Sequence, residues 1–235
     1  MRLKSALRRG VAAAVIAGIV VSSGIPAYAA RWDIANGDIT VKAGDAEGKN
    51  KVSQGETIDE DDTNTVITGE SDKNTVTIDT SKGDVDVTFD DLKIDASSGN
   101  EAAVSVTGKG DTTIELDGDN ELQGGDRHAG LEHNQTVDSE GNVTSGKLTI
   151  QDDNDNAGSL TATSGYFGAG IGGGSKNAGQ VTITGGTITA IGTDAAGIGG
   201  GQGNVSSIAG NADIEISGGT ITAAGGDGAA GIGGG

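Results

Sequence analysis

The chain of 235 residues contains 44 glycines, no cysteine, and 34 acidic against 15 basic residues, for a net charge of −19. This charge argues against binding to nucleic acid or to anionic membrane, because both need Lys and Arg to neutralise phosphate. The lack of cysteine excludes disulfides and thiolate metal sites.

Residues 1–29 have the three parts of a secretory signal peptide. Four basic residues in the first ten are followed by an apolar run over residues 11–21 and by the small-residue site Ala27-Tyr28-Ala29. The apolar run is shorter than the roughly 20 residues that span a bilayer. We therefore expect cleavage after Ala29, no membrane insertion afterwards, and a secreted, extracellular or wall-associated product. It would keep 11 basic and 34 acidic residues, a net charge of −23.

After the signal peptide, short segments alternate apolar and polar residues. High glycine content and high net charge raise the expectation of disorder, but short β-branched runs bounded by Gly, Asn, Asp and Ser are typical of strands. The clearest are TVTID (75–79), VDVTF (85–89), VSV (104–106), TIEL (113–116), KLTI (147–150) and VTIT (181–184). The pattern predicts an all-β chain.

Residues 30–146 are predicted to form irregular coils of the same architecture as the later repeats. Trp32, near the start, is expected to cover the open end of the core, because terminal coils need capping. The residues predicted to point inward are Ile39, Val41, Val66, Ile67, Val76, Ile78, Val85, Val87, Phe89, Leu92, Ile94, Val104, Val106, Ile114, Leu116 and Leu122.

Three acidic segments could bind calcium, because calcium prefers six to eight oxygen ligands. They are residues 59–62, residues 152–156, and the segment DGDNE (117–121) with Asp126. The third is the best candidate, with the ligands Asp117, Asp119, Asn120, Glu121 and Asp126. None has the spacing of an EF-hand, and Asp, Asn and Gly are equally typical of solvated turns.

The segment HAGLEH allows a zinc site through His128, His133 and Glu132, although surface histidines are the simpler interpretation. A polysaccharide lyase would need a cationic base, for which Arg127, Lys109 and Lys147 are the candidates. The secreted part has only two arginines and no cationic cluster. We therefore expect no catalytic residue and no enzymatic activity.

The last third of the chain aligns with itself. Residues 148–174, 181–201 and 214–235 repeat one pattern, with variable inserts between them. A constant core with insertions at one point is how a solenoid grows, one coil per repeat. Stacking should place Ile183 over Ile216, and Ile188 between Leu160 and Ile221. Residues 147–235 are thus predicted to be regular glycine-rich coils, and a stop at the coil corner of Gly235 suggests that the natural chain continues.

The recurring AGIGGG segment could be either a phosphate-binding site or a structural corner. Residues 168–173 match G-x-G-x-x-G, but that motif binds phosphate only where a helix follows it. No helix is predicted here, and the segment occurs three times. The glycines are therefore predicted to be corners, with three short strands per coil and about seven or eight coils.

The motifs GDITV (37–41), NTVTI (74–78), TTIELDGDNELQGG (112–125), AGL (129–131), GSLTATSG (158–165) and the GAGIGGG repeats resemble secreted bacterial right-handed β-helix proteins. These proteins bind carbohydrate and are similar in fold to pectate lyases. The resemblance covers the whole chain after the signal peptide. It implies a right-handed parallel β-helix, the use of calcium, and association with polysaccharide or a cell surface.

The expected function is a binding or adhesion module for an extracellular polysaccharide or a host or cell-wall glycan, assisted by calcium. A purely structural stalk is the main alternative, and a calcium-dependent lyase is a weaker one. Ice binding is a further alternative, because Thr187 and Thr189 would stack on Thr220 and Thr222, with Ser159 and Thr161 on the other side. Threonine is also simply a good exposed strand residue.

Overall fold

A computed structural model describes residues 30–46, 48–203 and 212–235. The signal peptide expected at residues 1–29 lies outside the described residues. The described part consists of strands and one short 3-10 helix, η1 (Ile34–Asn36). No helix in this part is long and apolar enough to cross a membrane.

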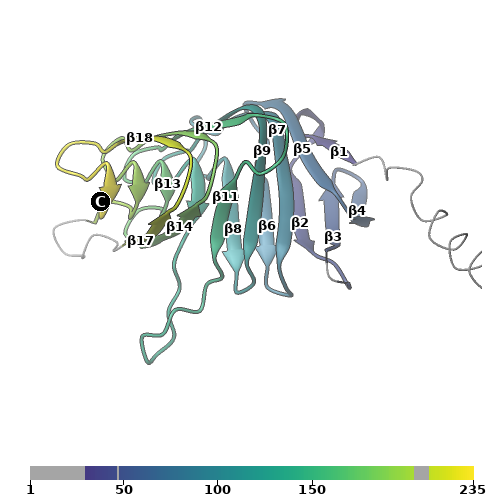
Figure 1. The fold of residues 1–235 in the computed structure, drawn as a ribbon, viewed down its shortest axis with the longest axis horizontal. Helices are drawn as coiled ribbons and strands as arrows, with labels where there is room; N and C mark the ends of the chain where they lie inside the picture. The colour runs from purple at the N-terminus through teal and green to yellow at the C-terminus, as the bar shows by residue number, and fades with distance from the viewer. Residues whose placement is uncertain (1–29, 47, 204–211) are drawn as a thin grey trace, which may run out of the picture.

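The strands wind into a parallel β-helix whose coils lie side by side from one end of the molecule to the other (Figure 1). Two sheets run along its length, and each coil gives one strand to the main path of each sheet, which makes seven coils in the described part. The first sheet contains β1 (Arg31–Asp33), β5 (Thr65–Ser71), β7 (Val85–Asp95), β9 (Thr112–Gln123), β11 (Leu148–Gln151), β14 (Gly179–Ile183) and β17 (Ala212–Ile216). The second contains β2 (Ile39–Ala43), β6 (Val76–Thr80), β8 (Val104–Gly108), β10 (Leu131–His133), β13 (Ile171–Gly172), β16 (Ile198–Gly199) and β19 (Ile232–Gly233).

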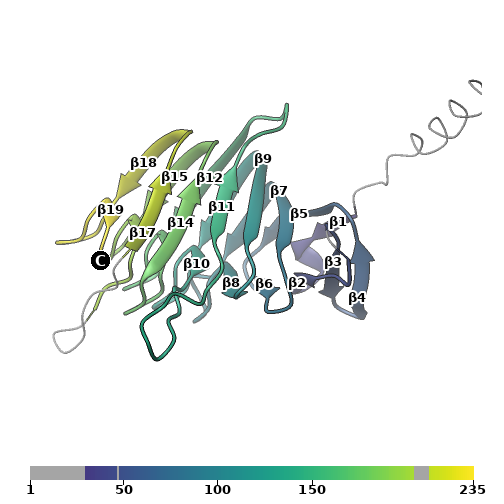
Figure 2. The same cartoon turned by 60° about the horizontal axis from the view of Figure 1, so that its bottom comes forward.

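A third side is formed differently in the two halves of the molecule. In coils 3 and 4 the long strands β7 and β9 bend and supply two sides each. Their bends contain the positive-φ residues Asp91 and Gly118, and the pairing register shifts between Asp90 and Lys93. In coils 5 to 7 the chain is broken at this corner, and separate strands β12 (Gly158–Thr163), β15 (Thr187–Ile191) and β18 (Thr220–Ala224) continue the second half of β9. The stacked strands are seen in Figure 2.

Aliphatic side chains form continuous ladders inside the coils. Ile183 pairs with Ile216, and Ile188 lies between Leu160 and Ile221, as the repeat predicts. Each buried aliphatic side chain contributes roughly 1.5–3 kcal/mol, so stacked coils stabilise one another. All the residues predicted to point inward belong to the core cluster except Val66. Val66 pairs with Thr88 on the outer side, since its neighbour Ile67 occupies the inward position.

The N-terminal end of the core is covered by a hairpin that the sequence pattern did not predict. Strands β3 (Asn50–Gln54) and β4 (Thr57–Asp62) extend the second sheet in antiparallel fashion beyond β2. Trp32 lies in the first coil as part of the core cluster, and its Nε1 donates to Asp62 Oδ2 at 2.8 Å. The hairpin and Trp32 thus close this end together.

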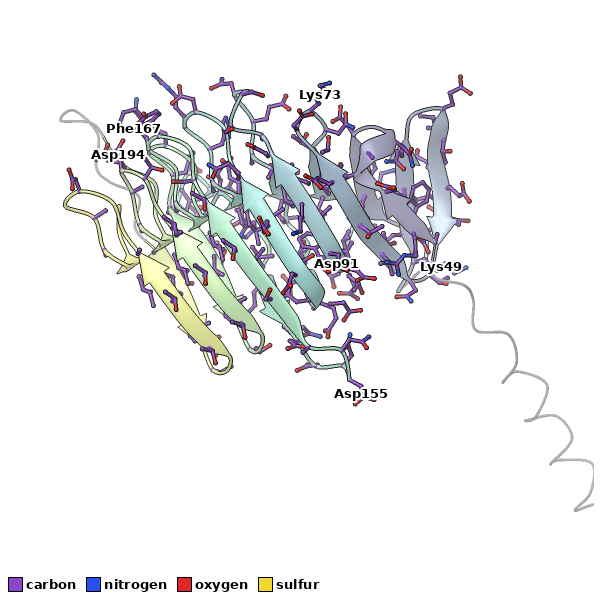
Figure 3. All side chains as sticks on the ribbon, turned by 90° about the horizontal axis from the view of Figure 1, so that it is seen from above. Lys49, Lys73, Asp91, Asp155, Phe167 and Asp194 are labelled. Atoms are coloured by element: carbon purple, nitrogen blue, oxygen red, sulfur yellow. The ribbon has the colours of Figure 1, made fainter. Side chains whose placement is uncertain are left out.

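The inserts between strands lie at the corners of the coils. The largest, residues 134–147 between β10 and β11, projects from the body of the molecule (Figure 1) and is closed by a bridge between Val137 and Val143; we call it the excursion. Figure 3 looks onto the third side and shows Asp155, in the insert between β11 and β12, at one edge of this face. Phe167 and Asp194 lie at the opposite edge. Among the described residues, no insert lies on the face between these edges.

The glycine-containing strands β13, β16 and β19 of the last three coils bring backbone against backbone. Gly172, Gly199 and Gly233 are in register and have φ values of 129°, 137° and 137°. A Cβ at Gly172 would collide with the carbonyl oxygen of Gly199. Among the described residues no helix follows any AGIGGG segment. Gly172, Gly199 and Gly233 are therefore strand residues, which corrects the prediction that the glycines are corners; it holds for glycines outside the strands, such as Gly168 and Gly173. Without a following helix, the segments lack the context of a phosphate-binding loop.

Candidate functional site

Three turns from neighbouring coils meet at the edge marked by Phe167 in Figure 3. The N–H of Arg127 donates to the carbonyl of Tyr166 at 2.7 Å, and the N–H of Ser175 donates to the carbonyl of Arg127 at 2.8 Å. We call this group the corner cluster: Arg127, His128, Tyr166, Phe167, Ser175 and Lys176. Its members come from the turn before β10, the turn before β13 and the loop before β14.

The backbone of the corner cluster is held in an unusual conformation. Arg127, Phe167 and Lys176 all have φ of 69°, and they are three of the five non-glycine residues with positive φ in the described part. Such conformations are uncommon outside glycine, Asn and Asp, and they persist only where the surroundings fix them. These three residues, with Ser175, Gln202 and Gly203, line one hollow of about 220 Å³.

The corner cluster contains exposed aromatic side chains. Tyr166 is 61% and Phe167 is 37% exposed, and their ring centroids are 6.3 Å apart. Trp32 and Phe89 are buried in the core cluster. In the part of the chain that the structure describes, the corner is therefore the place where aromatic faces are accessible to a ligand.

Beside Arg127 and His128 lies a buried carboxylate. Glu132 is only 5% exposed, although it occupies an outward position on β10. Its Oε2 accepts from the backbone N–H of Ala129 at 3.2 Å and lies 2.8 Å from Nδ1 of His128, while its Oε1 accepts from Nδ2 of Asn134 at 2.8 Å. Because a carboxylate only accepts, Nδ1 of His128 carries the proton of this pair. The contact fixes the imidazole ring and leaves its Nε2 for a ligand.

The five residues predicted to bind calcium do not form a common site. Asp117 accepts from Nδ2 of Asn154 at 2.6 Å, and Asp119 accepts from Oγ of Ser159 at 2.8 Å. The other three pairings are Asn120 with backbone groups inside the coil, Glu121 with Lys93 at 3.0 Å, and Asp126 with Arg127 at 3.6 Å. No group of three or more acidic or histidine side chains in the described ranges is arranged to hold a metal ion.

Asn120 explains why this segment differs from a calcium loop. It is 1% exposed and lies at an inward position beside Leu160. Its Oδ1 accepts from the N–H of Leu92 at 2.9 Å, and its Nδ2 donates to the carbonyls of Asp117 and Ser159, both at 3.0 Å. The amide thus satisfies backbone groups that the bend of β9 leaves unpaired, because buried polar groups need partners. Its oxygen is not available to an external cation.

The other two acidic segments also have structural partners. Asp59 and Asp61 pair with Lys42 at 3.3 Å and Lys51 at 2.8 Å, and Asp62 accepts from Trp32. In the second segment, Asp152 Oδ2 accepts from the N–H of Gly158 at 3.3 Å. Residues 59–62 thus belong to strand β4 and not to the solvated turn considered for them, whereas residues 152–156 lie in the insert between β11 and β12.

His128 and His133 have different environments and do not share a site. His128 contacts Glu132, whereas His133 is buried at an inward position and its Nδ1 lies 2.8 Å from the backbone carbonyl of Gln180. A zinc site through both rings is therefore not formed in the described structure. The zinc site does not form because Glu132 and His133 are adjacent in β10, so their side chains point to opposite sides of the strand.

The three cationic residues considered for a lyase also separate. Arg127 lies in the corner cluster, and Lys147 pairs with Glu215 at 3.6 Å. Lys109 lies at another corner, beside the excursion. The structure therefore does not gather them around one substrate position.

The threonine side chains of the third side are aligned as predicted. Thr187 pairs with Ser159 and Thr220, and Thr189 pairs with Thr161 and Thr222. Towards the N-terminal end the same rows continue as Asp119 and Glu121. The hydroxyl array therefore covers coils 5 to 7 and ends where carboxylates begin.

The sequence reasoning missed the corner cluster as a unit. A signal was present, because the adjacent aromatics Tyr166 and Phe167 stand in a glycine-rich turn of a chain with only five aromatic residues. Arg127, Phe167 and Lys176 are far apart in the sequence, however, and only the stacking of turns brings them together.

The comparison with known families agrees with this architecture. The Beta helix repeat family matches residues 156–175, 181–202 and 214–235, which lie in coils 5 to 7. No curated protein and no solved structure matches the chain significantly. The repeat matches and the parallel strand pairing together show that this chain is a parallel β-helix built from beta helix repeats in its C-terminal half.

Proposed function

We propose that this protein is a secreted or cell-surface binding module for carbohydrate, and that the corner cluster contacts the sugar. The observation that carries the proposal is the exposed pair Tyr166–Phe167 beside a hollow lined by Arg127, Ser175 and Lys176. The composition of residues 1–29, typical of a signal peptide, supports secretion.

Aromatic rings suit sugars because one face of a pyranose carries mainly C–H groups. Exposed Tyr and Trp rings contribute a large apolar contact area, and their polar atoms can hydrogen-bond at the rim. Here the Tyr166 hydroxyl and the two ring faces lie at one edge of the solenoid. A glycan chain could approach this edge from solvent without opening the core.

The polar groups of the corner cluster suit sugar hydroxyls. Arg127 supplies a planar set of donors, Lys176 a compact cation, and Ser175 a hydroxyl that both donates and accepts. The exposed pair of Arg127 with Asp126 costs little to rearrange, since surface ion pairs contribute about 0–1 kcal/mol. The contacts of the predicted calcium ligands leave them no shared cation site, so the proposal uses the side chains of this corner alone.

Glycan-array binding of the purified protein tests the proposal, followed by titration of the best glycan. We expect the double substitution Y166A/F167A to weaken binding about tenfold or more, because aromatic contacts of this kind contribute roughly 0.5–1.5 kcal/mol each. The matched control is Ile58→Ser, which removes a 71% exposed apolar side chain at the other end of the solenoid and should leave binding unchanged.

Calcium is tested in the same titration. Because the structure gathers no calcium ligands at the corner, excess chelator should leave the affinity within about twofold. A glycan that binds only with calcium would contradict this assignment of the site. If no glycan binds, or if Y166A/F167A and Ile58→Ser behave alike, the protein is better described as a structural stalk.

Ice binding is a second candidate, favoured by the aligned hydroxyls of Thr187, Thr189, Thr220 and Thr222. Rows on neighbouring strands repeat at about 4.8 Å, and side chains along one strand face repeat at about 6.6 Å. The inserts at the corners leave this face uncovered (Figure 3). Thermal hysteresis that is lost in Thr189→Tyr would support this function, and its absence from the unaltered protein would exclude it.

A further inference from the structure

A second hollow lies beneath the excursion, and a histidine closes it. Ser81, Val106, Thr107, Gly108 and Lys109 form one wall, at the ends of β6 and β8. The other wall is made by His133, Asn134, Thr136 and Thr144. The volume of about 540 Å³ falls within the roughly 300–1,000 Å³ of ligand pockets.

His133 stands where the fold calls for an aliphatic side chain. In the second sheet it is paired with Val106, which is paired with Ile78, which in turn is paired with Val41. All three are buried in the core cluster. A polar ring at this position, only 2% exposed, is an exception that packing alone does not require.

The tautomer of His133 follows from its contact. Nδ1 lies 2.8 Å from the carbonyl oxygen of Gln180, which can only accept, so Nδ1 carries the proton. Burial lowers the pKa of His133 below its usual value, against the raising effects of the Gln180 carbonyl and of Asp111. The ring is therefore neutral at pH 7, and Nε2 presents a lone pair.

Nε2 is left for a ligand. It has no hydrogen-bond partner among the described residues, and Thr112 Oγ1 is the one fully buried side-chain polar atom there without a partner. Nε2 therefore remains accessible to solvent. The space that His133 lines is the hollow beneath the excursion. A buried acceptor of this kind favours a donor placed opposite it.

The excursion is fixed over the hollow. The N–H of Thr144 donates to the carbonyl of Thr136 at 2.8 Å, and their hydroxyl oxygens are 2.9 Å apart. Oγ of Ser145 donates to Oε1 of Gln180 at 3.2 Å, and the N–H of Gln135 donates to the carbonyl of Ala178 at 2.9 Å. Gln180, whose carbonyl contacts His133, thus also anchors the base of the excursion through its side chain.

We infer that this hollow is a second sugar subsite, in which Nε2 of His133 accepts a hydrogen bond from a pyranose hydroxyl. Val106 and the threonine methyls offer an apolar wall to the ring, while Ser81, Thr136, Thr144 and Lys109 offer polar contacts at its rim. Asn134 lines this hollow and also a smaller one formed with Arg127, Ser175 and Lys176 of the corner cluster. The choice of ligand class rests on the proposed function.

The ring nitrogens of His133 report directly on the inference. Nitrogen-15 spectra of the two imidazoles are recorded while methyl glycosides of glucose, galactose, mannose and N-acetylglucosamine are added to the full protein. We expect at least one glycoside to shift Nε2 of His133 saturably, with its Nδ1 proton retained. His133→Phe should weaken this glycoside at least fivefold, measured by the shifts of the Thr136 and Thr144 amides.

Two further variants separate the subsites. Lys109→Ala, at the exposed rim, should weaken the glycoside about threefold and serves as the second test if His133→Phe does not fold. Y166A/F167A should leave the His133 response intact while it weakens array binding. If no glycoside shifts His133 while Y166A/F167A still abolishes array binding, the inference is overturned and the proposed function survives. A His133 response that disappears in Y166A/F167A would also overturn it.

Discussion

Coils 1 to 4 and coils 5 to 7 build the same solenoid with different residues. In the first group the core is filled by large side chains such as Phe89 and Leu116, and β7 and β9 run unbroken around a corner. In the second group the corner strands are separate, Ala162 and Ala190 replace larger residues, and glycine turns allow backbone contact. One part therefore relies on side-chain burial, and the other relies on close backbone stacking. This difference predicts which substitutions each part tolerates.

The largest effect is expected for the side-chain-filled coils. Phe89→Ala should lower the free energy of unfolding by about 4 kcal/mol, because it leaves a cavity in the core. Chemical denaturation measures the change. Ala190→Gly, which removes a smaller buried side chain in coil 6, should cost about 1 kcal/mol. Equal losses for the two would show that the two groups of coils are stabilised in the same way.

In the glycine-rich coils, the sensitive position is one without a side chain. Gly172→Ala should cost about 3 kcal/mol, because the new Cβ would collide with the Gly199 carbonyl in a backbone conformation with φ of 129°. Gly228→Ala is the matched control, since φ is 77° there but nothing lies within 4 Å of the Cβ. Similar melting curves for these two variants would contradict the close stacking of β13 on β16.

The boundary between the two groups is marked by Asn120, which pairs with Leu160 in the next coil and accepts from the N–H of Leu92. Asn120→Leu should cost about 2 kcal/mol despite the better match of side chains, because the N–H of Leu92 would lose its acceptor. Leu122→Ile, one inward position further along β9, should cost less than about 1.5 kcal/mol. A more stable Asn120→Leu protein would mean that the amide serves a ligand and not the bend.

Sequence reasoning succeeded where local pattern and repeat length determine the structure. The alternation in TVTID and VTIT predicted the strands, and the near-constant repeat predicted the pairing of Ile183 with Ile216. It failed at Asn120, because DGDNE resembles a solvated loop and only the bend of β9 turns its amide inward. It failed at the corner cluster for a related reason. Arg127, Phe167 and Lys176 are brought together by stacking, which no single segment encodes.

The smallest effect on the free energy of unfolding is expected for His133, which lies in the aliphatic ladder of coils 1 to 4. Burial lowers its pKa in the folded state below the usual value of 6.5, so the unfolded chain binds the proton first. The free energy of unfolding should therefore fall as the pH drops below about 6.5, and His133→Phe should remove this slope.

The pH range separates this effect from that of the carboxylates. The pKa values of Asp79, Asp95 and Asp138 are lowered by hydrogen bonds from Ser81, Ser97 and Asn142, so their stabilising contribution is lost only as the pH falls towards and below 3.8. The difference between the unaltered protein and His133→Phe in denaturation between pH 5 and 8 therefore reports on His133 and not on these carboxylates. An unchanged slope in His133→Phe would contradict the burial of a neutral ring.

Cysteine pairing tests the stacking of coils most directly, because the chain has no cysteine of its own. Thr189 and Thr222 are partners on β15 and β18, and neighbouring strands lie about 4.8 Å apart, within the 4.4–6.8 Å that a disulfide needs between Cα atoms. The double variant T189C/T222C should therefore oxidise almost completely within one molecule. T187C/T222C, one step out of register at about 8 Å, should remain reduced. Equal oxidation of both pairs, or oxidation of the out-of-register pair alone, would contradict a parallel β-helix with these coils in this register.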